Sequence, residues 1–166
     1  MVKLCQTRFV ERYVAVGRFW EQLPGIVAAL KVMQSWKDRK ASSSASTHLN
    51  NLLKTEFLAG VRILLYFAAH LRPLSLFLQE KGLDLTRALD SIESVIAVFK
   101  YIRQEVEHEF NRIFTEVVDV ANKLWVEVRA PRAPSVSRFR SNAGYYEDTE
   151  TYYRINVFIP AVEAVT

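Results

Sequence analysis

Apolar residues recur at steps of three and four along most of the chain, which is the spacing of one face of a helix. Over Phe9–Trp36 this spacing predicts a first helix, which we expect Pro24 and Gly25 to split or kink because proline lacks the helix donor. Residues 48–72 are apolar almost all around a helix, so they predict a buried central helix that Pro73 ends or bends.

A polar, serine-rich segment separates these two predicted helices. Residues 37–47 include the run Ser42–Ser44 and predict a surface connection. The hydroxyl of Ser46 or Thr47 is the candidate cap of the following helix, because it can accept a bond from an unpaired backbone N–H there.

The clearest pattern is a heptad seam in the C-terminal half, over residues 84–124. Its apolar positions alternate at steps of four and three: Leu85, Leu89, Ile92, Ile96, Phe99, Val106, Phe110, Ile113, Val117, Val120 and Leu124. Arg103 fills the one slot that is not apolar. The seam predicts one long helix, roughly 60 Å in length. Two explanations stay open, packing against the central helix and pairing with another chain.

The chain as a whole predicts an all-α fold, with residues 1–128 as a helical bundle. Residues 129–148 hold prolines, serines and arginines and predict a basic loop. Residues 149–166 predict a short C-terminal helix, broken near Pro160, that leads to a missing downstream region. Glycine and proline are scarce, at five each among 166 residues, which argues against a turn-rich all-β fold.

Composition narrows the class of protein further. The single cysteine, Cys5, excludes an internal disulfide and a zinc site built on several cysteines. Arg62 interrupts the longest apolar stretch, residues 57–71, which falls short of the roughly 18 residues that a membrane span needs. The N-terminus lacks the apolar core of a signal peptide. We therefore expect an intracellular protein that does not enter a membrane.

The net charge is +4, and positive charge is concentrated in two places. Residues 1–54 carry nine lysines and arginines against three acids, and residues 126–146 carry four arginines against one glutamate. The four arginines are Arg129, Arg132, Arg138 and Arg140. Arginines bind phosphates, and the aromatic residues interleaved with them can stack on unpaired bases. This segment is a candidate DNA contact, and a solvated surface loop is the alternative.

One cluster on the predicted long helix could carry chemistry. Glu105, His108, Glu109 and Arg112 lie one turn apart, and a Glu-x-x-His pair is half of a di-iron carboxylate site in helical bundles. No second Glu-x-x-His pair occurs in the sequence, so we favour the alternative, an exposed network of acids with Arg112. No nucleophile elbow, phosphate loop or zinc-protease motif is present.

The order of several short motifs resembles the hAT superfamily of transposases. Thr7-Arg8-Phe9, followed by Arg12 and Ala15, is similar to the TRW box of that family. Further motifs follow in the order of the family: Glu56-Phe57-Leu58, Leu71-Arg72-Pro73-Leu74-Ser75, Glu109-Phe110, Arg140-Ser141-Asn142, Tyr152-Tyr153-Arg154 and Ile159-Pro160. Each motif is short, and their shared order along the chain carries the resemblance.

This resemblance implies both a fold and a location. Transposases of this family carry an all-helical insertion within an RNase H-like catalytic core, and the TRW box belongs to the insertion. The chain would then be an insertion-domain segment of a nuclear protein, with the family's catalytic acids outside it. Arg8, Phe9 and Arg12 would contact DNA. Phe9 stands where the family has tryptophan, so it keeps a stacking face without the indole N–H, and a core position is its other explanation.

Two functions are consistent with these observations. The first is a non-catalytic fragment or domesticated remnant of a hAT-type transposase that binds the DNA backbone weakly. The alternative is a helical protein–protein interaction module without DNA binding, which uses residues 84–124 for self-association or for a protein partner. Under either function we expect no enzymatic activity, no metal and no cofactor.

Overall fold

The structure is a computed structural model of the chain, and it describes residues 8–80, 82, 84–131 and 148–166, with side chains from Arg12 onward. The elements are α1 (Arg8–Met33), α2 (Arg39–Leu52), α3 (Thr55–Phe77), α4 (Leu85–Gln104), α5 (Val106–Leu124), α6 (Thr149–Tyr153), the π-helix η1 (Arg154–Phe158) and α7 (Ile159–Glu163). The described residues form no strand, and this confirms the expected all-α helical bundle.

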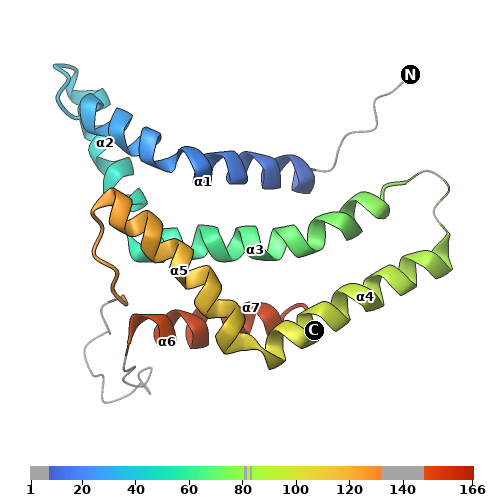
Figure 1. Cartoon of the computed structure of the whole chain (residues 1–166). Helices are drawn as coiled ribbons and strands as arrows, with labels where there is room; N and C mark the ends of the chain where they lie inside the picture. Colours follow the sequence, from blue (N-terminus) through green and yellow to red (C-terminus); the bar gives the residue numbers. More distant parts are fainter. Residues whose placement is uncertain (1–7, 81, 83, 132–147) are drawn as a thin grey trace, which may run out of the picture.

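The helix α3 runs through the middle of the bundle (Figure 1). Helix α1 packs along α3, and α2 turns back from the end of α1 and packs against it. Helix α5 crosses α3, and α4 packs against both α3 and α7. The C-terminal segment from α6 to α7 lies against α4 and α5, so the last residues of the chain complete the core.

Aromatic rings from four helical segments fill this core. Phe158 of η1 is fully buried, and its ring centroid lies 5.2 Å from that of Phe110 and 5.7 Å from that of Tyr66. Phe67 of α3 stacks on Phe99 of α4, with the two centroids 5.3 Å apart. Each such pair adds roughly 0.5–1.5 kcal/mol beyond the buried area. The C-terminal helices are therefore bound to the bundle by ring packing.

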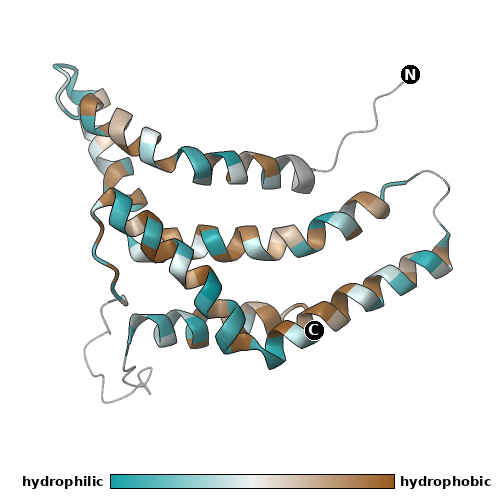
Figure 2. Cartoon of the chain, viewed as in Figure 1, coloured by the Kyte–Doolittle hydropathy of each residue, from teal (hydrophilic) through white to brown (hydrophobic). Residues whose placement is uncertain are grey.

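Helix α3 carries apolar residues along its whole length (Figure 2). By length and composition alone it could cross a membrane, and the core helix of a soluble bundle meets the same test. Arg62 of α3 donates two hydrogen bonds to the carboxylate of Glu116 of α5, both at 2.6 Å. The buried residues of α3 include Ile63, Tyr66 and Phe67, so α3 is the buried central helix that the sequence predicted. Its bounds differ from the predicted residues 48–72, because α2 ends at Leu52 and α3 begins at Thr55.

The prediction of one long helix over residues 84–124 is wrong, because the chain forms two helices there. The backbone leaves helical geometry at Glu105 (φ −95°, ψ 28°), and α4 and α5 diverge from this residue (Figure 1). The break follows Arg103, the single polar slot of the heptad seam. Arg103 Nε donates to Glu163 Oε1 of α7 at 3.0 Å, so this slot faces a carboxylate and not the apolar core. The seam therefore bends around the C-terminal helices.

The boundaries of the N-terminal helices also differ from the prediction. Residues 37–47 are mostly helical, because α2 begins directly after Asp38, whose carboxylate accepts the backbone N–H of Lys40 at 2.9 Å. Some of the hydroxyls of α2 are compatible with the helix because they donate to carbonyls one turn earlier. Ser46 Oγ, for example, donates to the carbonyl of Ser42 at 2.9 Å. An aspartate, and neither of the proposed hydroxyls, caps this helix.

Three prolines lie inside the described helices. Pro24 does not split α1, because the buried residues Leu23 and Val27 fix the helix to the core on both sides of it. Pro73 likewise lies within α3, which continues to Phe77. Pro160 follows the π-helix η1, whose wider turn accommodates the missing donor, so the C-terminal helix continues past it.

Candidate functional site

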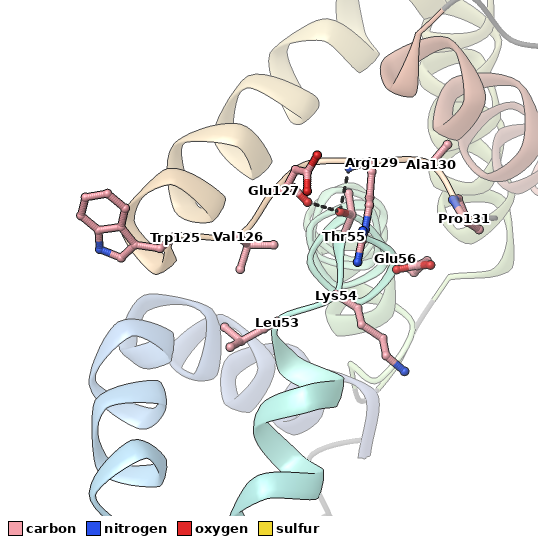
Figure 3. A pocket seen from close by; sticks show the side chains of 10 residues that line it. All are labelled: Leu53, Lys54, Thr55, Glu56, Trp125, Val126, Glu127, Arg129, Ala130 and Pro131. Carbon is pink, nitrogen blue, oxygen red and sulfur yellow. Dashed lines mark hydrogen bonds between the residues drawn. The ribbon is translucent and has the colours of Figure 1, made fainter.

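A cleft of about 340 Å³ opens where the turn between α2 and α3 meets the extended segment after α5 (Figure 3). Its lining residues come from two stretches of the chain: Leu53, Lys54, Thr55 and Glu56 from the first, and Trp125, Val126, Glu127, Arg129, Ala130 and Pro131 from the second. These stretches lie far apart in sequence, so the fold itself assembles the cleft.

Thr55 joins the two walls of the cleft. Its buried hydroxyl accepts the backbone N–H of Arg129 at 3.1 Å and donates to the carbonyl of Glu127 at 3.3 Å. The carbonyl of Arg129 accepts the hydroxyl of Tyr153 at 3.3 Å. Burial raises the pKa of the Tyr153 phenol, so this group stays protonated and remains a donor at neutral pH. These bonds fix the segment after α5 against the start of α3.

Trp125 stands at one edge of the cleft in a conformation that favours glycine. It ends α5 in the left-handed region (φ 58°, ψ 39°), and it is the one non-glycine residue with positive φ in the part of the chain that the structure describes. Its N–H donates to the carbonyl of Asn122 at 3.2 Å, and the N–H of Val126 donates to that of Ala121 at 2.9 Å. This pair of bonds is the Schellman motif, in which glycine usually holds the left-handed position.

Trp125 is hardly buried by the fold that holds its backbone. Its side chain is 92% exposed and points away from the cleft (Figure 3). A bulky residue in the left-handed region is a backbone outlier, and such outliers gather at sites where function requires the residue. The bundle therefore gains little stability from the Trp125 side chain.

The charges of the cleft are mixed. Lys54 and Arg129 line it, and so do Glu56 and Glu127. Lys54 Nζ donates to the side-chain oxygen of Asn51 at 3.1 Å, a neutral partner that leaves the lysine charge uncompensated. The two acids keep the cleft close to neutral overall. It offers two cations and an exposed ring, a combination that can contact a phosphate and a base without strong attraction to polyanions.

The predicted DNA-binding residues are distributed unevenly. Arg129 lies in the cleft, and Arg12 lies elsewhere, in an apolar groove of about 370 Å³ between α1 and α3. The side chains of Arg8 and Phe9, in the first turn of α1, lie outside the described residues. The other three arginines of the predicted basic loop also lie outside them: Arg132, Arg138 and Arg140.

Arg12 and Arg129 lie near different parts of helix α3, so the helix provides an estimate of the distance between them. The backbone N–H of Arg129 binds Thr55, the first residue of α3, whereas the groove at Arg12 is lined by Leu64, Leu65 and Ala68 of the same helix. From Thr55 to Leu64 the helix rises by roughly 14 Å. The two arginines therefore belong to different surfaces, and the structure does not bring them into one compact site.

The cluster around Glu109 is an ion-pair network. Glu109 Oε2 accepts the Tyr66 hydroxyl at 2.8 Å and the Arg112 guanidinium at 2.9 Å. Nδ1 of the exposed His108 lies 3.7 Å from Glu109 Oε1. Burial, reinforced by Glu109, raises the pKa of Tyr66. The predicted contact between Glu109 and Arg112 is thus confirmed, and no group of three metal-binding side chains lies together among the residues described.

Sequence reasoning missed Trp125. Its position fell within residues 1–128, which the sequence assigned to the helical bundle, so nothing marked it as exposed. The signal that could have found it is positional, since Trp125 directly follows the last apolar slot of the heptad seam, Leu124, where a helix end calls for glycine.

Comparisons with known proteins add no neighbour for this site or fold. No protein-family model, no curated protein and no solved structure matches the chain.

Proposed function

We propose that this chain is a non-catalytic remnant of a hAT-type transposase that binds the DNA backbone weakly in the nucleus. The proposal joins the motif order of the sequence, from the box at Arg8 and Phe9 onward, to one structural observation. That observation is Trp125, which the bundle holds in a strained backbone conformation with its ring in solvent, at the edge of the cleft that Lys54 and Arg129 also line.

An exposed indole at the edge of a cleft with two cations suits unpaired or distorted nucleic acid. The ring can stack on a base, and the cations that line the cleft can contact phosphates elsewhere on the same strand. The sequence that follows Pro131 adds Arg132, Arg138 and Arg140, so the positive charge that the cleft itself lacks is supplied by the adjoining chain. Because the cleft also holds two acids, we expect weak binding with a strong dependence on salt.

The test is the binding of the full chain to labelled duplex, hairpin and single-stranded DNA across a potassium chloride series. Contact with the backbone predicts a log–log slope of about −0.9 for each phosphate neutralised on a duplex. The quadruple variant Arg129/Arg132/Arg138/Arg140→Ala should bind more weakly and with a shallower slope. Trp125→Ala should weaken binding to the hairpin and the single strand more than binding to the duplex, because only unpaired bases can stack.

A matched control separates this effect from general loss of exposed aromatic surface. Tyr101 of α4 is 59% exposed and lies away from the cleft, so Tyr101→Ala should leave every affinity unchanged. Binding near zero at low salt for the wild-type chain would end the DNA proposal. Equal losses in Trp125→Ala and Tyr101→Ala would remove the cleft from it.

A protein-interaction module is the second candidate, and the first two turns of α4 favour it. Leu85 is 74% exposed and Leu89 is 54% exposed, and Ile92 continues the same stripe one turn later. Exposed apolar stripes of this kind are typical of surfaces that bind another protein. If this function holds, the purified chain sediments as an oligomer, and Leu85→Glu/Leu89→Glu returns it to a monomer without loss of helicity.

A further inference from the structure

The turn between α1 and α2 concentrates positive charge on one corner of the bundle. Lys31, Lys37, Arg39 and Lys40 are all exposed there, and we call them, with Trp36, the basic corner. Asp38 is the one acid between residues 31 and 54. None of the four cations forms an ion pair with any residue that the structure describes.

Asp38, the one acid in this stretch of the sequence, is already engaged. Asp38 Oδ1 accepts the backbone N–H groups of Lys40 at 2.9 Å and Ala41 at 3.4 Å, which makes it the N-cap of α2. The carboxylate is therefore directed at the backbone of its own helix. The four cations face solvent without a competing side-chain partner, so the corner carries a net positive field.

Trp36 lies within this field, and the turn holds it in place. Its side chain is 52% exposed, and its backbone N–H donates to the carbonyl of Met33 at 3.2 Å. The Ser42 hydroxyl donates to the carbonyl of Gln34 at 2.7 Å, and the Gln34 amide donates to Ser46 Oγ at 3.1 Å. These bonds tie the backbone of the turn to α2, so the fold holds Trp36 at a position where about half of the residue is exposed.

We propose that the basic corner binds single-stranded nucleic acid, with Lys37, Arg39 and Lys40 on the phosphates and Trp36 stacked on a base. Uncompensated cations around an aromatic platform are the common pattern of sequence-tolerant single-strand binding. A lipid surface fits less well, because membrane binding scales with buried apolar area, and among its neighbours only Val32 adds a strongly exposed apolar side chain.

This site is separate from the cleft at Trp125. The basic corner lies at the start of α2, and the cleft lies just beyond its end at Leu53. The 14 residues of α2 place roughly 21 Å between them. The proposal goes beyond the function suggested for the cleft, and either surface can bind nucleic acid without the other.

The test uses the full chain and a fluorescein-labelled oligothymidine of about 20 nucleotides, followed by anisotropy across a potassium chloride series. In Lys37→Gln/Arg39→Gln/Lys40→Gln the log–log slope should become shallower by about 2, since each phosphate on a single strand contributes about 0.7. Trp36→Ala should weaken binding by about 5-fold or more while leaving the slope unchanged, because it removes stacking and no charge.

Two controls match these variants. Arg18→Gln/Arg87→Gln/Lys100→Gln removes the same charge from exposed positions on α1 and α4, and Tyr101→Ala removes an exposed ring elsewhere. Circular dichroism checks that each variant keeps the helicity of the wild type. The proposal is overturned if the control triple matches the corner triple, or if Trp36→Ala binds as the wild type does.

The same measurements separate this proposal from the one for the cleft. If Trp125→Ala has no effect while the corner triple loses affinity, the basic corner stands and the cleft fails. The reverse result leaves only the cleft. Phosphatidylserine vesicles provide the last comparison, since vesicle binding that depends on Trp36 in a chain that ignores oligothymidine would assign the corner to lipid and overturn the proposal.

Discussion

Replacing Trp125 by glycine should stabilise the bundle and weaken nucleic-acid binding at the same time. A side chain with a Cβ in the left-handed region costs roughly 1–2 kcal/mol, and glycine avoids this cost. Glycine also loses more backbone entropy on folding, by roughly 0.5–1 kcal/mol, so the net gain is about 0.5–1 kcal/mol. Because the indole is 92% exposed, its removal forfeits little burial. For a chain of this length the expected rise in Tm is about 1–4 °C.

Trp125→Ala is the matched variant for this prediction. Alanine keeps the Cβ and therefore the strained backbone, so Trp125→Ala should leave the Tm close to that of the wild type. Both variants lose the ring, and both should bind unpaired DNA about 5-fold or more weakly. Thermal unfolding followed by circular dichroism measures the first effect, and anisotropy measures the second. A Tm of Trp125→Gly below that of Trp125→Ala would refute the argument from strain.

Three further predictions test the fold. Phe158→Ala should lower the free energy of unfolding by about 3–5 kcal/mol in urea titrations, because this fully buried ring joins the C-terminal helices to the core. Arg62 lowers the pKa of Glu116 below its usual value of 4.5, so the ion pair stabilises the fold above that pH and the stabilisation is lost as the pH falls through the lowered pKa. Arg62→Met should therefore destabilise the chain by about 0.5–1 kcal/mol at neutral pH, and this loss should shrink as the pH falls through the lowered pKa of Glu116. Leu85→Glu should leave the unfolding free energy within about 0.5 kcal/mol of the wild type, since that residue is exposed.

Periodicity alone was sufficient to predict the class of the fold. Apolar steps of three and four identified most of the helical segments, and an all-round apolar pattern marked α3 as the central helix. The helix boundaries could not be predicted from periodicity, because each boundary depends on a competition between a few local interactions. Asp38 caps α2 a few residues before the serines, in a polar stretch that composition assigns to a loop, and Pro24 remains within a helix because Leu23 and Val27 are buried on both sides of it.

The candidate sites, like the fold, could be predicted from the sequence only in part. Charge counts located the basic N-terminal third and the arginines after residue 128, yet they could not show which cations lack a partner. Ion pairing depends on tertiary contacts, as when Arg62 meets Glu116 across 54 positions of the chain. The exposure of Trp36 and Trp125 could not be predicted from the sequence, because tryptophan is an apolar residue that is usually found in a core. Only the fold shows that both residues face solvent.

The heptad seam shows why a periodic pattern leaves two explanations open. Along α4 the exposure of the seam falls from 74% at Leu85 to 54% at Leu89 and 36% at Ile92, and it reaches 0% at Phe99. From Phe110 onward the seam residues of α5 lie mostly in the core. Internal packing therefore accounts for the later part of the pattern, whereas its first two turns have the character of a face that a partner could cover. A repeat of apolar positions defines a face of a helix, but it carries no information on what lies against that face. The sequence held one clue to the helix break. Arg103 is a charged residue in an otherwise apolar seam, and the helix breaks just after it, where the residues that pack against the seam change.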